Sequence, residues 1–217
     1  HAGCLTAASA LARRYEGDNP VLIYLPETAF DTEQFIRDVE TALEKTPNVI
    51  VCISEGINDG KGTFICELSS DVGVDTFGHK MLTGSGKYLE NLVKDRLGVK
   101  VRSIELNVCQ RCSSAMLSGT DQKEAIASGA YGVKCALEGE TGKMVAFRRV
   151  PGEDYRVDYV TEDVNLICNQ EKGVPLEWIT EHGSDVGKEF IEYALPLIQG
   201  EVKVPVKDGL PLFAYRK

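Results

Sequence analysis

The sequence predicts an α/β fold in which a parallel, Rossmann-like sheet is flanked by helices. Two short apolar runs, 21–26 and 48–56, end in proline or in Ser-Glu-Gly and predict buried strands. Between them, apolar residues recur at helical spacing over 31–45, after an aspartate suited to cap a helix. A buried strand, a helix and a second buried strand in this order are typical of a parallel sheet.

The remaining elements are expected in alternation along the chain. The sequence predicts helices at about 3–15, 79–97, 120–138 and 184–196, and strands at 101–106 and 143–150. Gly84 and Gly86 weaken the first turns of the helix at 79–97. Trp178 is most simply an anchor of a core or an interface.

Composition and charge narrow the class of partner. The chain has 217 residues, of which 43% are hydrophobic and 26% charged, as in a globular protein with a sizeable core. Its net charge of −9 argues against binding to nucleic acid or to an anionic membrane. No apolar run approaches the roughly 18 residues of a membrane span, and no signal peptide is evident.

The cysteines indicate the compartment. Seven of them are scattered along the chain, mostly within apolar runs such as VIVCIS and LICN. An odd, dispersed set of this kind is typical of buried, reduced thiols rather than of a disulfide framework. We therefore expect a cytoplasmic protein.

Three charged residues lie where ligands bind in open parallel sheets, at or beyond the ends of strands. Glu55 ends the second predicted strand, and Arg102 and Arg111 lie around the third. Arginine binds phosphate through two parallel charged hydrogen bonds, and a carboxylate accepts hydrogen bonds from sugar hydroxyls. These residues predict a phosphorylated ligand; the alternative for each is a solvated surface charge.

Two other motifs suggest a chemical function, but each lacks part of the pattern that the function requires. Gly84-Ser85-Gly86-Lys87 lacks the earlier glycine and the following Ser or Thr of a phosphate-binding loop. Cys109 and Cys112 have the spacing of a redox dithiol or of half a zinc site, yet no second pair follows. The alternative is two semi-buried thiols beside a functional arginine. Local spacing assembles no catalytic triad, carboxylate pair or metal cluster.

Three segments resemble the 6-phosphofructokinase family. HAGCLTAASALAR resembles the helix after the family's Met-Gly-Arg motif, and VCISEG resembles the strand whose glutamate holds fructose 6-phosphate. KVRSIELNVCQRCSSAMLSGTD is similar to the family's Arg…Gln-Arg signature. The later segments EGETGKMVAFRR and KGVPLEWI resemble the bacterial pyrophosphate-dependent branch, so that the match runs nearly end to end.

The resemblance implies a role for each candidate residue. Glu55 is expected to bind the fructose hydroxyls, Arg111 the sugar phosphate, and Arg102 the 6-phosphate, in this family often across a subunit boundary. The two arginines stand nine residues apart, as the family signature requires. Val108 occupies a position that is commonly His or Tyr in the family, so we expect no side-chain contact with the ligand there.

The resemblance also implies that this chain is the C-terminal portion of a longer enzyme. The glycine-rich donor site and the Thr-x-Asp-x-Asp catalytic segment are expected upstream of His1, and no metal ligand is expected in this chain, so the chain alone is expected to be inactive. Residues 1–160 would form the fructose 6-phosphate-binding lobe. Residues 161–217 would form a helical or irregular extension packed on that lobe or on the missing one.

The function implied for the whole enzyme is a step of glycolysis. A phosphoryl group passes from pyrophosphate to the 1-hydroxyl of fructose 6-phosphate, with Mg²⁺ as cofactor, in a homodimer or homotetramer. Two alternatives are an ATP-dependent 6-phosphofructokinase and a non-catalytic sugar-phosphate-binding module of the same fold.

Overall fold

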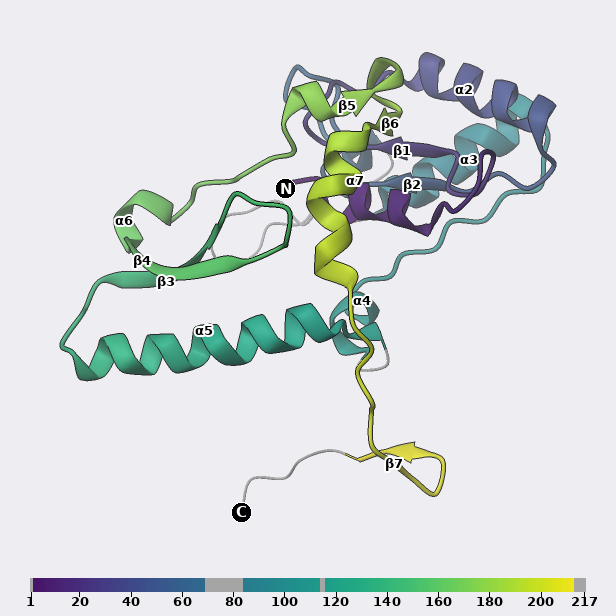
Figure 1. Cartoon of the computed structure of the whole chain (residues 1–217). Helices are drawn as coiled ribbons and strands as arrows, with labels where there is room; N and C mark the ends of the chain where they lie inside the picture. The colour runs from purple at the N-terminus through teal and green to yellow at the C-terminus, as the bar shows by residue number, and fades with distance from the viewer. Residues whose placement is uncertain (1, 69–83, 114–115, 213–217) are drawn as a thin grey trace. The chain divides into compact units, whose positions relative to one another are not determined.

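The computed structural model describes residues 2–68, 84–113 and 116–212. The chain forms two compact units, and it passes between them three times (Figure 1). Unit 1 comprises residues 1–105 and 171–194, and unit 2 comprises residues 106–170 and 195–217. The lobes expected from the sequence, 1–160 and 161–217, differ from these units and stay a prediction about the whole protein. No helix among the described residues is long and apolar enough to span a membrane.

The predicted strand–helix–strand motif is present in unit 1. Strands β1 (Leu22–Tyr24) and β2 (Val51–Ile53) are parallel, and α2 (Thr32–Lys45) connects them. The Asp31 carboxylate accepts hydrogen bonds from the backbone amides of Glu33 and Gln34, which satisfies two free donors at the start of α2. The α/β class predicted from the sequence is therefore confirmed.

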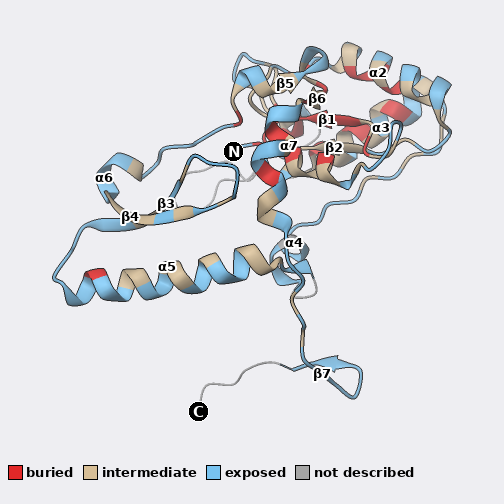
Figure 2. Cartoon of the chain, viewed as in Figure 1, coloured by how far each residue is buried: buried red, intermediate tan, exposed pale blue. Residues whose placement is uncertain are grey.

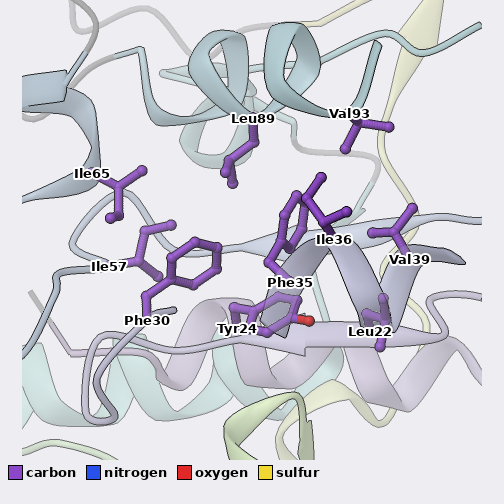
Figure 3. Close-up of a cluster of buried hydrophobic side chains, with 10 residues drawn as sticks. All are labelled: Leu22, Tyr24, Phe30, Phe35, Ile36, Val39, Ile57, Ile65, Leu89 and Val93. Carbon is purple, nitrogen blue, oxygen red and sulfur yellow. The ribbon is translucent and has the colours of Figure 1, made fainter. Parts of the chain in front are cut away.

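Strand β1 separates two hydrophobic cores. Its side chains alternate, so Leu22 and Tyr24 face one core while Ile23 and its neighbour Leu25 face the other. Figure 3 shows the first core, in which the rings of Tyr24, Phe30 and Phe35 meet edge to face or tilted. The buried members of the second core come from both segments of unit 1: Ala7, Ala10, Ile23, Leu25, Val174, Val186, Phe190 and Ala194.

The other elements of unit 1 surround these cores. They are α1 (Cys4–Ala7), η1 (Ala8–Ala12), η2 (Ile65–Leu68), α3 (Ser85–Leu97), η4 (Leu176–Trp178), β5 (Ile179–Thr180), η5 (Glu181–Gly183), β6 (Asp185–Val186) and α7 (Lys188–Ala194). The label η marks a 3-10 helix. Trp178 packs against the rings of Phe190 and Tyr193, consistent with a core anchor.

Three predicted elements differ in the structure. The helix expected at 3–15 is one α-helical turn followed by a 3-10 helix that ends at Ala12. The helix expected at 79–97 begins at Ser85, because Gly84 before it has a left-handed φ of 94°; residues 79–83 lie outside the described residues. The helix expected at 184–196 is α-helical only over 188–194.

Unit 2 is built around a long helix and a hairpin. Helix α5 (Gly119–Leu137) packs on the antiparallel strands β3 (Lys143–Arg149) and β4 (Val157–Asp163). The predicted helix at 120–138 and strand at 143–150 are thereby confirmed. The remaining elements are α4 (Cys109–Cys112), α6 (Val164–Ile167), η6 (Leu195–Ile198), β7 (Val206–Lys207) and β8 (Leu210–Pro211).

A single carboxylate joins three distant segments of unit 1. Glu27 Oε1 accepts hydrogen bonds from the backbone amides of Gly3 at 2.7 Å and Val174 at 2.9 Å. A Cβ atom on Gly3 would lie 2.6 Å from Glu27 Oε2, so glycine is required for this close approach. Glu27 thus fastens the start of the chain and the returning segment to the end of β1.

We expect Glu27→Ala to destabilise the protein by about 2–4 kcal/mol, because two charge-assisted hydrogen bonds are lost between segments. Urea denaturation followed by circular dichroism measures this change. Glu16→Ala is the matched control, since Glu16 is exposed and its removal should alter stability by less than about 0.5 kcal/mol. Equal effects of the two substitutions would contradict a fastening role for Glu27.

Candidate functional site

Glu55 lies in an exposed turn directly after β2. The turn is fixed by its backbone: the Ser54 amide donates to the Tyr24 carbonyl at 3.0 Å, and the Ile57 amide donates to the Ser54 carbonyl at 3.3 Å. Gly56 is buried behind the turn. Within the part of the chain that the structure describes, no hydrogen bond or ion pair engages the Glu55 carboxylate, which leaves it available to accept bonds from a ligand's hydroxyls.

Arg102 lies in an extended segment, but this segment is not the predicted strand 101–106. The segment alternates: Val99, Val101 and Ser103 are partly buried, whereas Lys100 and Arg102 are exposed. The amide of Ser103 donates to the Glu90 carboxylate at 2.8 Å instead of to a neighbouring strand, so no β-ladder forms there. The Arg102 side chain therefore points to the exposed side of a segment that a helix holds in place.

The first turns of α3 support both Glu55 and Arg102. The hydroxyl of buried Ser85 donates to the Glu55 carbonyl at 3.5 Å. On the same helix, Glu90 Oε2 also accepts the Ser103 hydroxyl at 2.6 Å, and its Oε1 pairs with Lys87 at 2.5 Å. The turn with Glu55 and the segment with Arg102 are thus attached to one helix within unit 1.

Arg111 belongs to unit 2, where it lies on the one-turn helix α4. Its side chain is exposed, and its backbone amide donates to the Val108 carbonyl at 2.9 Å. Glu55 and Arg102 lie on one scaffold within unit 1. The placement of Arg111 relative to them is not determined, because Arg111 lies in the other unit. The roles of all three residues stay predictions.

The cysteines differ from expectation in their burial. All seven are free thiols, but only Cys66 and Cys135 are buried, whereas Cys4, Cys109, Cys112 and Cys168 are exposed. Cys109 and Cys112 are the first and last residues of α4, a single helical turn, and both thiols are exposed. Burial raises the pKa of the Cys66 thiol. Although Cys4 is exposed as a residue, partial desolvation of its thiol, together with the nearby Glu27, raises the pKa of that group as well.

The residues that the structure describes contain no cluster of metal-ligating side chains. No group of three or more His, Cys, Asp or Glu side chains gathers within residues 2–68, 84–113 and 116–212 in a way that could hold a metal ion. Mg²⁺ prefers several oxygen ligands in an octahedral arrangement.

Three supporting residues, Ser85, Gly86 and Glu90, were not predicted from the sequence. Ser85 and Gly86 belong to the Gly-Ser-Gly-Lys motif that lacks the pattern of a phosphate loop; here they begin α3 and pack against the candidate segments. Only one contact of Glu90 can be predicted from the sequence: it follows Lys87 by three residues, a spacing that favours an ion pair on one helix face. Its contact with Ser103 depends on the folded path of the chain and has no local signature.

Comparison with known proteins identifies the family. The phosphofructokinase family model matches residues 1–136, which is more than half of the sequence. This chain belongs to the phosphofructokinase family, an assignment consistent with its α/β fold and with the predicted Glu55, Arg102 and Arg111 signature.

Several relatives carry the name of one branch of that family. The chain is 35% identical over 214 residues to a pyrophosphate–fructose 6-phosphate 1-phosphotransferase of Halomonas elongata, covering 99% of this chain and 50% of that protein. It is 37% identical over 203 residues to the protein of the same name from Rhodospirillum rubrum, covering 91% of this chain. A crystal structure of a pyrophosphate-dependent phosphofructokinase from Marinobacter aquaeolei matches 98% of this chain with a TM-score of 0.81 and 30% identity.

The chain spans about half the length of these relatives. It covers 50% of the Halomonas protein and 49% of the Marinobacter chain. About as many residues again of each relative lie outside the match.

The link between Glu90 and Ser103 should weaken in acid. Hydrogen bonds to the Glu90 carboxylate lower its pKa from 4.5 to about 2. The hydrogen bond from Lys87 has the largest effect, and those from Ser103 follow. A carboxyl group with a lowered pKa stabilises the folded state above about pH 4.5, and this contribution is lost as the pH falls toward about 2. The stability difference between the wild type and Glu90→Gln should therefore shrink between these two pH values.

Urea titrations of both proteins at pH 7, 4 and 3 measure this difference. Glu40→Gln, which changes an exposed glutamate of α2, is the control. If the difference in unfolding free energy between the wild type and Glu90→Gln did not change with pH, the proposed contribution of the Glu90–Ser103 hydrogen bonds would be contradicted.

Proposed function

We propose that this chain supplies the fructose 6-phosphate site of a pyrophosphate-dependent phosphofructokinase. The observation that carries the proposal is the similarity to the Halomonas enzyme along 99% of the chain. The positions of Glu55 and Arg102 on one helical support add to it, because a turn carboxylate and an exposed arginine suit a sugar and its phosphate.

In the proposed complex each residue has a distinct task. The Glu55 carboxylate accepts hydrogen bonds from fructose hydroxyls, which orients the sugar. Arg111 and Arg102 donate charged hydrogen bonds to the 6-phosphate, which fixes the opposite end of the substrate. Holding both ends restricts the 1-hydroxyl to one place, and such positioning is a large part of catalysis in phosphoryl transfer.

We propose that other residues of the whole protein carry out the remaining parts of the reaction. The base for the 1-hydroxyl proton and the ligands of Mg²⁺, which would neutralise charge on the phosphoryl donor, are proposed to lie in the portion of the relatives that this chain does not span. We further propose that the protein acts in the cytoplasm, in keeping with its seven free thiols. A homodimer or homotetramer is proposed because Arg102 is expected to act across a subunit boundary.

The donor and the reaction are tested together by an activity assay. The protein translated from the complete reading frame is incubated with fructose 6-phosphate, Mg²⁺ and either pyrophosphate or ATP, and fructose 1,6-bisphosphate is measured. We expect product with pyrophosphate alone. Product with ATP alone would agree with the proposed sugar site but contradict pyrophosphate as the phosphoryl donor. Binding of fructose 6-phosphate without product would indicate a non-catalytic sugar-phosphate-binding module.

The phosphate contacts are tested by substitution in the same protein. Arg111→Ala should weaken fructose 6-phosphate binding by about 1.5–3 kcal/mol, the usual contribution of a hydrogen bond to a charged group. Isothermal titration calorimetry measures this change. Arg14→Ala, which removes an exposed arginine far from the candidate residues in sequence, should leave the affinity unchanged. An unaltered affinity in Arg111→Ala would remove Arg111 from the site.

A further inference from the structure

Cys109 and Cys112 form a pair of thiols for which the proposed function has no use. They are the first and last residues of α4, and Arg111, the proposed phosphate ligand, lies between them. Both thiols are free and exposed, and Figure 2 shows α4 in the pale blue of exposed residues. Each of the other five cysteines lies alone in its element or connection, so among the described residues this is the one pair on a single helix.

The spacing of the two cysteines places their side chains on one face of α4. Residues three apart on a helix have Cβ atoms about 5–6 Å apart, whereas a disulfide needs about 3.5–4.5 Å between its two Cβ atoms. A bond between Cys109 and Cys112 therefore requires their Cβ atoms to approach by roughly 1–2 Å. The turn that carries Arg111 must change shape to allow this approach.

The backbone of α4 is suited to such a change. The Cys109 amide donates to the Leu106 carbonyl at 2.9 Å, and the Arg111 amide donates to the carbonyl of Val108 at the same distance. These bonds span three residues, the pattern of a tight 3-10 turn. Asn107, just before the turn, has a φ of 45°, which non-glycine residues seldom adopt. A single turn also lacks the run of successive bonds that makes a long helix cooperative.

A zinc site is the other use of two cysteines at this spacing, and the structure does not favour it. A structural zinc ion takes four ligands, usually Cys and His. Within the described ranges no third His, Cys, Asp or Glu side chain gathers with the pair in a way that could hold a metal ion. The pair thus has both of the groups that a disulfide needs and half of those that zinc needs.

We propose that Cys109 and Cys112 form a reversible disulfide that weakens fructose 6-phosphate binding by displacing Arg111. The oxidant is a small disulfide such as glutathione disulfide. The thiolate of one cysteine attacks a sulfur of the oxidant, which releases one thiol and leaves a mixed disulfide. The second thiolate attacks the protein sulfur of that mixed disulfide and releases the other thiol. The protein loses two electrons and two protons, and the oxidant gains them as two thiols.

The inference rests on the proposed sugar site, because its effect passes through Arg111. A guanidinium binds phosphate through two parallel hydrogen bonds of fixed geometry, so a displacement on the order of 1 Å weakens at least one of them. Arg111 must be reachable from solvent in the whole protein if it binds a dissolved substrate, so the oxidant can reach the same turn. A disulfide that strains its turn is readily reduced, which makes the change reversible.

Disulfide formation is tested first, without reference to the sugar. The protein translated from the complete reading frame is treated with glutathione disulfide in the presence of a chelator and digested with trypsin. Cleavage after Arg111 leaves Cys109 in the peptide 103–111 and Cys112 in the peptide 112–123. We expect mass spectrometry to find these peptides joined until dithiothreitol is added. A lasting glutathione adduct on either cysteine, or no reaction of the pair, would overturn the proposal.

Isothermal titration calorimetry then measures fructose 6-phosphate binding before and after oxidation. Oxidation should weaken it at least about fivefold, the lower end of usual coupling between sites. Cys112→Ser should bind alike in both conditions, whereas Cys168→Ser, which removes another exposed cysteine of unit 2, should retain the full response. Equal affinities of reduced and oxidised wild type would overturn this inference alone. No binding by the reduced protein would overturn the proposed sugar site and this inference with it.

A redox titration checks the coupling from the other direction. If oxidation weakens binding, binding must oppose oxidation by the same factor. In glutathione buffers, saturating fructose 6-phosphate should therefore raise, by that factor, the ratio of glutathione disulfide to the square of glutathione at which half of the pair is oxidised. Fructose, which lacks the phosphate, is the matched control and should leave this midpoint unchanged. A midpoint that fructose 6-phosphate does not move would contradict the coupling.

Discussion

The burial of strand β1 on both faces is the constraint on which the rest of unit 1 depends. Its three residues and the following Leu25 alternate between two hydrophobic cores, so the strand is shared by both. One core contains α2 and α3; the other contains the first and last segments of the unit. The Glu55 turn takes its position from β1 through the Ser54 amide, and α3 then fixes the segment that carries Arg102. The geometry of the candidate site therefore follows from the packing around one short strand.

The helices and strands that could be predicted from the sequence are those determined by residues within the element itself. Helix α2 was predictable because its capping aspartate and its apolar spacing lie within the same fifteen residues. Helix α5 and strand β3 were predictable on the same grounds. The segment 101–106 has the alternation of a strand, yet whether it pairs depends on a partner strand elsewhere, and here Glu90 takes the Ser103 amide instead. The division into units was likewise hidden, because two distant segments complete each unit.

The candidate residues were accessible to sequence reasoning for a similar reason. Glu55, Arg102 and Arg111 stand at the ends of apolar runs, where a charged group is conspicuous, and their order resembles a family signature. The residues that support Glu55 and Arg102 are ordinary by type: a serine, a glycine and a glutamate on α3. Such supports act through contacts between segments far apart in the chain, so composition and periodicity do not distinguish them from other surface residues.

The order in which the chain visits the two units bears on its synthesis. The second core of unit 1 needs Val174, Val186 and Phe190, which follow the whole of residues 106–170. A ribosome adding 5–20 residues per second would take roughly 5–20 s to make the about 90 residues between 105 and 194. During that interval the apolar side of β1 and of the N-terminal helix is exposed in the nascent chain. Such a chain presents apolar surface for longer during translation than one whose core is complete before the next unit begins.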